Sequence, residues 1–183
     1  MLLVGTVGGL IVAFITIFKK TWAPVTAPLY ALLEGLALGA ISVVFEAQFP
    51  GIVFQAVVLT FSVLLAMLLC YRTGLIKPSE NLKLALFAAM AGILIFYMFA
   101  AVLSVFGARA PLIWDSGPFG ILFSLFVVGV AALTLVIDFD FIEQGVAKGA
   151  PKYMEWYAAF GLMVTLIWLY LEILRLLAKS RRR

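Results

Sequence analysis

Carboxylates gather at the end of a long uncharged run of the sequence. The stretch Val136–Gly145, VIDFDFIEQG, places Asp138, Asp140 and Glu143 within six residues of a chain that has only nine acidic residues. Carboxylates that meet in an apolar environment repel one another, which favours the binding of a proton or a cation. Hard cations such as calcium prefer oxygen ligands of this kind. The stretch predicts a proton or cation site in its two aspartates, whereas we interpret Glu143 as the solvated end of a helix.

The composition identifies the environment in which these carboxylates act. Of the 183 residues, 66% are hydrophobic and 12% are charged, and the mean hydropathy is +1.20. A soluble domain is about half apolar and about a quarter charged, so this chain is a multi-pass protein of the lipid bilayer. The chain has no histidine, which excludes Ser-His proteases, bis-histidine haem proteins and HExxH metalloproteases. We therefore expect neither an enzyme nor a cofactor.

Six apolar segments are long enough to cross a bilayer as helices, which takes about 17–25 residues. They are residues 2–18, 28–45, 51–71, 84–108, 118–137 and 153–174. The prolines, at positions 24, 28, 50, 78, 111, 118 and 151, fall at or between segment ends, where a missing N–H is tolerated. Short connections join the segments, so residues 1–183 are expected to form a single all-α membrane bundle. The Gly5-xxx-Gly9 and Gly35-xxx-Gly39 spacings predict close helix packing, with a dimer face as the alternative.

Basic residues indicate how the bundle is oriented. The loops after the first, third and fifth segments hold Lys19, Lys20, Arg72, Lys77, Lys83, Lys148 and Lys152, whereas the loops after the second and fourth hold only Arg109. These charges lie at segment ends, where they set topology rather than bind nucleic acid, and they place the first set of loops in the cytoplasm. Met1 then begins outside, which indicates either that a further helix lies upstream or that translation was assigned from an internal methionine. The basic tail, Lys179 and Arg181 to Arg183, contradicts this pattern if the sixth segment crosses fully.

Four carboxylates enter the predicted spans from the cytoplasmic side. Glu34 lies six residues past Pro28, about 9 Å along the second span, with no lysine or arginine in the adjacent turns. Asp138 and Asp140 close the fifth span, and Glu155 opens the sixth. We expect all four to converge on one inner-facing cavity. Residues two apart lie on nearly opposite helix faces, so only one aspartate can face the bundle, and we favour Asp140.

Several segments resemble a known family. These segments are ALLEGLALGAIS in the second span, VIDFDFIEQG closing the fifth and YLEILRLLAK ending the sixth. They resemble the Bax inhibitor-1 family, also called the transmembrane Bax inhibitor motif family, and in particular its bacterial YccA-like branch. The similarity runs from the first span to about residue 178. The resemblance implies a seven-helix fold, here without its first helix, in which the other helices surround the last. It also implies a pH-sensitive calcium leak governed by two aspartates, one ending the sixth helix and one on the last.

The chain departs from this pattern on its last helix. Asp140 corresponds to the first aspartate of the family, and Glu34 matches its early membrane carboxylate, but the second aspartate falls at Thr165. Asp140 would then pair with Thr165, Asp138 or Glu155. We expect a calcium or proton pathway in a bacterial inner (plasma) membrane, with Asp140 and Glu34 as calcium ligands.

Two alternatives come from other functional classes. YccA-like proteins are associated with membrane protein quality control, so the chain would instead be a non-transporting protein that modulates a membrane protease or an assembly factor. An intramembrane aspartyl protease has less support, because Asp138 and Asp140 share one helix and no second span carries an aspartate.

Overall fold

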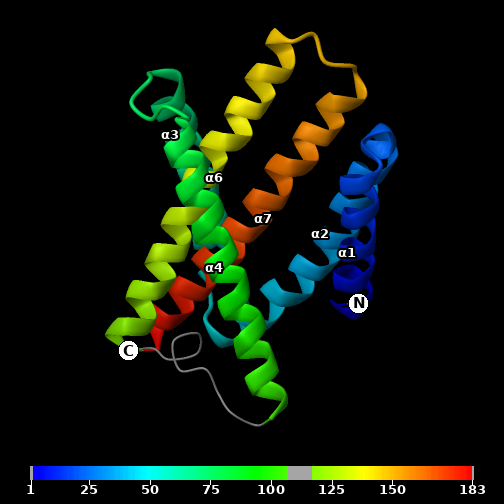
Figure 1. Cartoon of the computed structure of the whole chain (residues 1–183). Helices are drawn as coiled ribbons and strands as arrows, with labels where there is room; N and C mark the ends of the chain where they lie inside the picture. Colours follow the sequence, from blue (N-terminus) through cyan, green and yellow to red (C-terminus); the bar gives the residue numbers. More distant parts are fainter. Residues whose placement is uncertain (1, 107–116, 183) are drawn as a thin grey trace.

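The computed structural model of the chain describes residues 2–106 and 117–182, and every regular element in this part is a helix (Figure 1). Arg109, Pro111 and residues 107–108 of the fourth predicted span lie outside it. The elements are α1 (Leu2–Phe18), a short 3₁₀ turn η1 (Lys20–Trp22), α2 (Ala23–Gln48), α3 (Ile52–Arg72), α4 (Glu80–Val105), α6 (Pro118–Ala147) and α7 (Tyr153–Arg181).

Within the described residues, all six predicted segments are therefore helical. Five helices are long and apolar enough to cross a membrane, namely residues 20–48, 52–72, 80–104, 118–147 and 153–181. The first, α1, is also apolar but has only 17 residues, so it extends about 26 Å at 1.5 Å per residue. The prediction of an all-α, multi-pass membrane bundle is confirmed.

The start of α2 differs from the prediction. The helix begins at Ala23 rather than at residue 28, so Pro24 occupies the first turn and Pro28 lies inside the helix. The expectation that every proline sits at or between segment ends is therefore wrong for Pro28. Its ring nitrogen cannot donate to the carbonyl of Pro24, so α2 lacks one backbone bond early in its length.

The end of α6 also differs. The helix continues past residue 137 as far as Ala147 and so includes the whole of VIDFDFIEQG. No proline interrupts this extension, and the chain turns only at Gly149, which has a φ of +62°. Asp138 and Asp140 consequently lie within a regular helix and not beyond its end.

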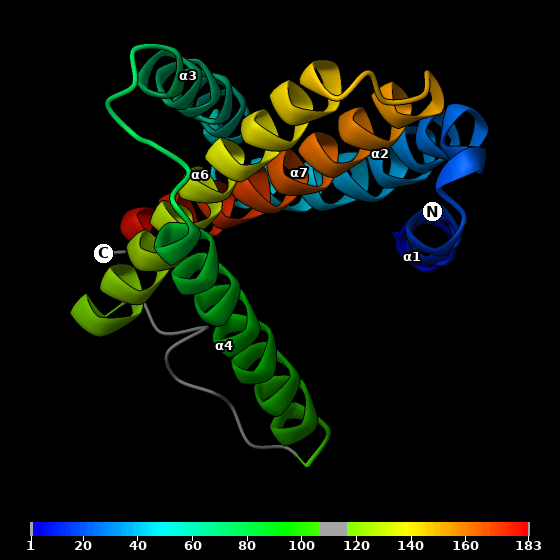
Figure 2. The ribbon, with the colours of Figure 1, turned by 45° about the horizontal axis from the view of Figure 1, so that its top comes forward.

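Helix α7 lies at the centre of the bundle. It packs against α2, α3 and α6. Ile52 of α3, Leu135 of α6 and Leu169 and Leu174 of α7 form the middle of the main core and are fully buried. Helix α4 packs on α6 and diverges from the α6–α7 pair (Figure 2). The placement of α7 agrees with the expectation that the last helix is surrounded by the others.

The two glycine spacings behave differently. A Cβ atom built on Gly5 would lie 2.6 Å from the carbonyl oxygen of Leu33, and one on Gly9 would lie 2.6 Å from Glu34 Oε1. The first pair therefore lets α1 approach α2 closely, as predicted. Nothing lies within 4 Å of a Cβ built on Gly35 or Gly39, so the prediction that this second pair packs against a helix is wrong within the described residues.

The three basic connections lie at one end of the bundle, which we call the basic-loop end (Figure 1). The α2–α3 connection and the C-terminus lie at the other end, which we call the tail end. Arg181 Nη1 donates to the carbonyl oxygen of Pro50 at 2.7 Å, and Arg181 Nη2 donates to Gln55 Oε1 at 3.0 Å. Helix α7 thus runs the full length of the bundle, and its basic tail lies opposite the basic loops.

Candidate functional site

Asp138 is the aspartate that faces the central helix. Its Oδ2 atom is buried and has no hydrogen-bond partner among the described residues. Across the interface, the side chain of Thr165 interacts with the Asp138 carboxylate, and its hydroxyl donates to the carbonyl oxygen of Gly161 at 3.3 Å. A Cβ on Gly161 would be 4.0 Å from Asp138 Oδ1, so the glycine leaves room for the carboxylate. Asp138 and Thr165 therefore form a polar contact between α6 and α7.

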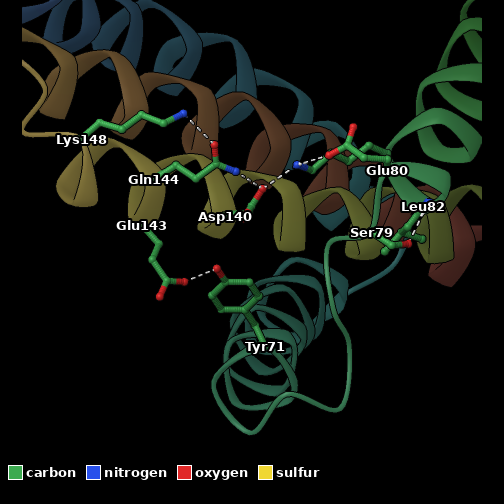
Figure 3. A network of polar contacts seen from close by, with 9 residues as sticks. Tyr71, Ser79, Glu80, Leu82, Asp140, Glu143, Gln144 and Lys148 are labelled. Carbon is green, nitrogen blue, oxygen red and sulfur yellow. Dashed lines mark hydrogen bonds and ion pairs between the residues drawn. The ribbon is translucent and has the colours of Figure 1, made fainter.

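Asp140 points to a different helix. Its Oδ2 atom lies 2.9 Å from Lys83 Nζ of α4 and accepts a 2.7 Å hydrogen bond from Gln144 Nε2 (Figure 3). Lys83 also pairs with Glu80 at 3.2 Å, and Lys148 donates to Gln144 Oε1 at 3.2 Å. The expectation that Asp140 meets Thr165 is therefore wrong. Asp138 and Asp140 lie on nearly opposite faces of α6, and it is Asp138 that lies on the face toward α7.

The remaining carboxylate of the stretch binds a third helix. Glu143 is exposed and accepts a hydrogen bond from the hydroxyl of Tyr71 near the end of α3 (Figure 3). Glu143 is thus at a solvated helix end, as interpreted from the sequence, and it also joins α6 to α3. Together with the Asp140–Lys83 pair, this contact ties the basic-loop ends of α3 and α4 to α6.

Glu34 and Glu155 lie elsewhere. Glu34 packs against Gly9 at the α1–α2 interface, whereas Glu155 is exposed in the first turn of α7. Among residues 2–106 and 117–182, no three His, Cys, Asp or Glu side chains gather closely enough to hold a metal ion. The predicted convergence of Glu34, Asp138, Asp140 and Glu155 on one cavity is therefore wrong, since their helices present them to separate interfaces.

A line of polar side chains continues along α7 from the Asp138–Thr165 contact. Thr165, Glu172 and Lys179 are spaced by seven residues, close to two helical turns, so they share one face of α7. They are 6%, 2% and 4% exposed. At 1.5 Å per residue, this row extends about 21 Å. We call these three residues and Asp138 the polar seam.

The middle of the polar seam holds an ion pair between the buried Glu172 and the half-buried Arg175. Arg175 Nη1 lies 2.8 Å from Glu172 Oε1 and 2.9 Å from Glu172 Oε2, a contact that the three-residue spacing on one helix favours. Tyr97 of α4 completes the group, since its hydroxyl donates to Glu172 Oε1 at 2.9 Å and accepts from Arg175 at 2.6 Å. The cluster therefore links α4 to α7.

The tail end of the polar seam holds a buried lysine. Lys179 Nζ donates to the carbonyl oxygen of Gly120 at 3.0 Å and to Ser124 Oγ at 2.9 Å, both on α6. From the sequence, Lys179 was assigned to the basic tail, and no role was predicted for Tyr97 or Ser124. The seven-residue spacing on α7 was the signal available for Lys179. Nothing local marks Tyr97, because its partners are more than seventy positions away.

The family model described as Bax inhibitor 1 like matches residues 1–182. The chain belongs to the Bax inhibitor 1 like family. Neither the curated proteins nor the solved structures contain a match to it. Membership and the apolar helices together establish a membrane-embedded helical member of this family.

Ionisable groups inside a membrane protein are rare because they are costly to bury, and they mark ion or proton pathways. In the polar seam, Glu172 and Lys179 are satisfied by neighbouring groups, whereas one oxygen of Asp138 is not. Asp138 is therefore the group of the seam that is best placed to exchange a proton or to meet a cation.

Proposed function

We propose that this protein is a pH-sensitive cation leak pathway with calcium as a permeant ion, and that protonation of Asp138 controls it. The observation that carries the proposal is the half-buried Asp138 side chain, which faces Thr165 of the central helix and whose Oδ2 atom is buried and unpartnered. Family membership supports the function, since the resemblance noted in the sequence implies such a leak. The similarity to YccA-like proteins supports a place in a bacterial inner membrane. No catalytic step forms part of the proposal.

The proposed control follows from the charge of one side chain. When Asp138 carries a proton, it is neutral and can donate a hydrogen bond, so α6 and α7 pack closely. When it is ionised, a buried carboxylate must recruit water or a cation, which separates the two helices. Among the described residues no lysine or arginine forms an ion pair with Asp138. From α7 it meets Thr165, and the neighbouring Asp140 is directed to Lys83 of α4.

Calcium entry into proteoliposomes tests the proposal. We expect the wild-type leak to be larger at pH 8 than at pH 6. Asp138→Asn, which stays neutral, is expected to give a small leak that is equal at both pH values. Asp140→Asn is the matched control, because it makes the same chemical change two positions away on the face toward Lys83. If Asp140→Asn removed the pH dependence and Asp138→Asn preserved it, the assignment to Asp138 would be wrong.

A second candidate function is a non-transporting protein that modulates a membrane protease or an assembly factor. One observation favours it, namely that Glu34 and Asp140 contact different helices and do not line a common cavity. This candidate predicts a stable co-purifying membrane partner together with calcium flux no greater than that of empty liposomes. Flux above that background in the wild type would exclude it as the sole function.

A further inference from the structure

A cleft lies at the basic-loop end, between the last turns of α6 and the first turns of α7. Its volume is about 580 Å³, within the range of about 300–1,000 Å³ that is usual for small-ligand sites. Phe141 and Val146 of α6 and Met154 of α7 are among the apolar side chains that line it. The cleft is therefore a concave apolar surface that extends into the level of the membrane spans.

Two opposite charges also line this cleft. Lys148 caps the end of α6, and Glu155 lies in the first turn of α7. The two side chains do not form an ion pair with each other, since Lys148 donates to Gln144 Oε1 at 3.2 Å. Neither residue belongs to the polar seam, so the proposed leak leaves them without a role. Lys148 keeps further N–H groups available to a ligand.

We propose that this cleft binds a phospholipid with a zwitterionic, hydrogen-bonding headgroup of the phosphatidylethanolamine type. The lipid phosphate would contact the ammonium of Lys148, and the lipid ammonium would contact the carboxylate of Glu155. The glycerol and the upper part of an acyl chain lie against Phe141 and Met154, and the rest of the chain remains in the bilayer. This inference does not depend on the proposed leak.

The charges of the lining select this occupant over other lipids. One positive and one negative side chain line the cleft, so a purely anionic headgroup gains one contact and is repelled by Glu155. A phosphatidylcholine headgroup has the same net charge but no N–H group to donate to the carboxylate. The ethanolamine ammonium makes both an ionic contact and a hydrogen bond, which is stronger than a charge contact alone.

Native mass spectrometry of the full chain tests the proposal. The protein is incubated with equal amounts of phosphatidylethanolamine, phosphatidylcholine and phosphatidylglycerol that carry the same acyl chains. We expect phosphatidylethanolamine to be retained over phosphatidylcholine by about fivefold, the factor expected for one net hydrogen bond. Glu155→Gln should lower this ratio, because a neutral amide oxygen accepts a weaker hydrogen bond from the lipid ammonium than a carboxylate does. Lys152→Gln, which alters the same loop but not the lining of the cleft, should leave the ratio unchanged.

A second variant separates the cleft from the general lipid surface. Ala158 lines the cleft, so Ala158→Phe should reduce retention of all three lipids without changing the thermal unfolding midpoint. Preferential retention of phosphatidylglycerol by the wild type would overturn the proposal in favour of an anionic lipid held by the basic loops. Equal retention of all three lipids by the wild type, unchanged in Glu155→Gln and Ala158→Phe, would also overturn it.

Discussion

The buried Glu172–Arg175 pair allows a quantitative test of the polar seam. The change is Glu172→Gln, which keeps the shape of the side chain and removes its charge. In the wild type, Glu172 is 2% exposed and accepts hydrogen bonds from Arg175 at 2.8 and 2.9 Å and from Tyr97 at 2.9 Å. The substitution leaves the guanidinium of Arg175 without its negative partner.

The size of the effect follows from the burial of the two partners. Removing one member of a fully buried ion pair destabilises a protein by about 3–5 kcal/mol. The Arg175 side chain is 33% exposed, so solvent compensates part of this loss, and we expect about 2 kcal/mol. For a chain of this length, 1 kcal/mol shifts the unfolding midpoint by about 2–4 °C, so the midpoint should fall by about 4–8 °C.

The assay is thermal unfolding of the purified protein in a single detergent. The matched control is Glu143→Gln, because Glu143 is an exposed carboxylate that accepts one hydrogen bond from Tyr71. We expect the control to shift the midpoint by less than about 2 °C, as is usual for exposed positions. Replacing both partners, in Glu172→Gln with Arg175→Met, should recover stability relative to the single variant, because no unpaired charge remains.

Two results would refute this reasoning. Equal midpoints for the Glu172→Gln and Glu143→Gln variants would show that the ion pair is effectively solvated. A double variant less stable than Glu172→Gln alone would show that Arg175 stabilises the bundle through contacts other than the pair.

Two further predictions concern helix packing. Gly5→Ala should destabilise the α1–α2 pair by about 1–3 kcal/mol, because the new Cβ would lie 2.6 Å from the Leu33 carbonyl oxygen. Gly35→Ala is the control: nothing lies within 4 Å of its Cβ, so the unfolding midpoint should stay unchanged or rise. Equal effects of the two changes on the midpoint would contradict the close approach of α1 and α2. Lys83→Gln removes the 2.9 Å contact with Asp140. Amide hydrogen exchange in the first turn of α4 should therefore accelerate relative to wild type. An unchanged exchange rate would show that the contact does not hold α4 to α6.

Much of the fold could be predicted because its signals are local. A run of apolar residues specifies a membrane helix by length alone, and glycines at i and i+4 present a flat surface to a neighbour. The choice between Asp138 and Asp140 could not be made in this way. Helix α6 is apolar on all its faces, so no amphipathic stripe fixes its rotation. Its rotation is set by contacts with α3, α4 and α7, which no local pattern within α6 reports.

The cavity of four carboxylates was predicted wrongly because a sequence pattern gives the depth of a side chain along its helix but not the neighbour that it faces. The depth of Glu34 and of Asp138 along their helices can be estimated from the rise per residue, and all four carboxylates begin at the same end of the bundle. Depth does not give direction. Glu34 faces α1 and Asp140 faces α4, so side chains that start from the same end of the bundle contact different neighbours.

The structure accounts for the basic tail that contradicts the charge rule for topology. That rule concerns lysines and arginines in the loops that flank a membrane helix. Lys179 is 4% exposed and is bound to Gly120 and Ser124 of α6, and Arg181 donates to the Pro50 carbonyl oxygen. Both cations also lie in the last turn of α7, where the helix dipole favours positive charge. They act as structural contacts that anchor the end of the central helix, so these two residues do not count against the orientation expected from the loops at the opposite end.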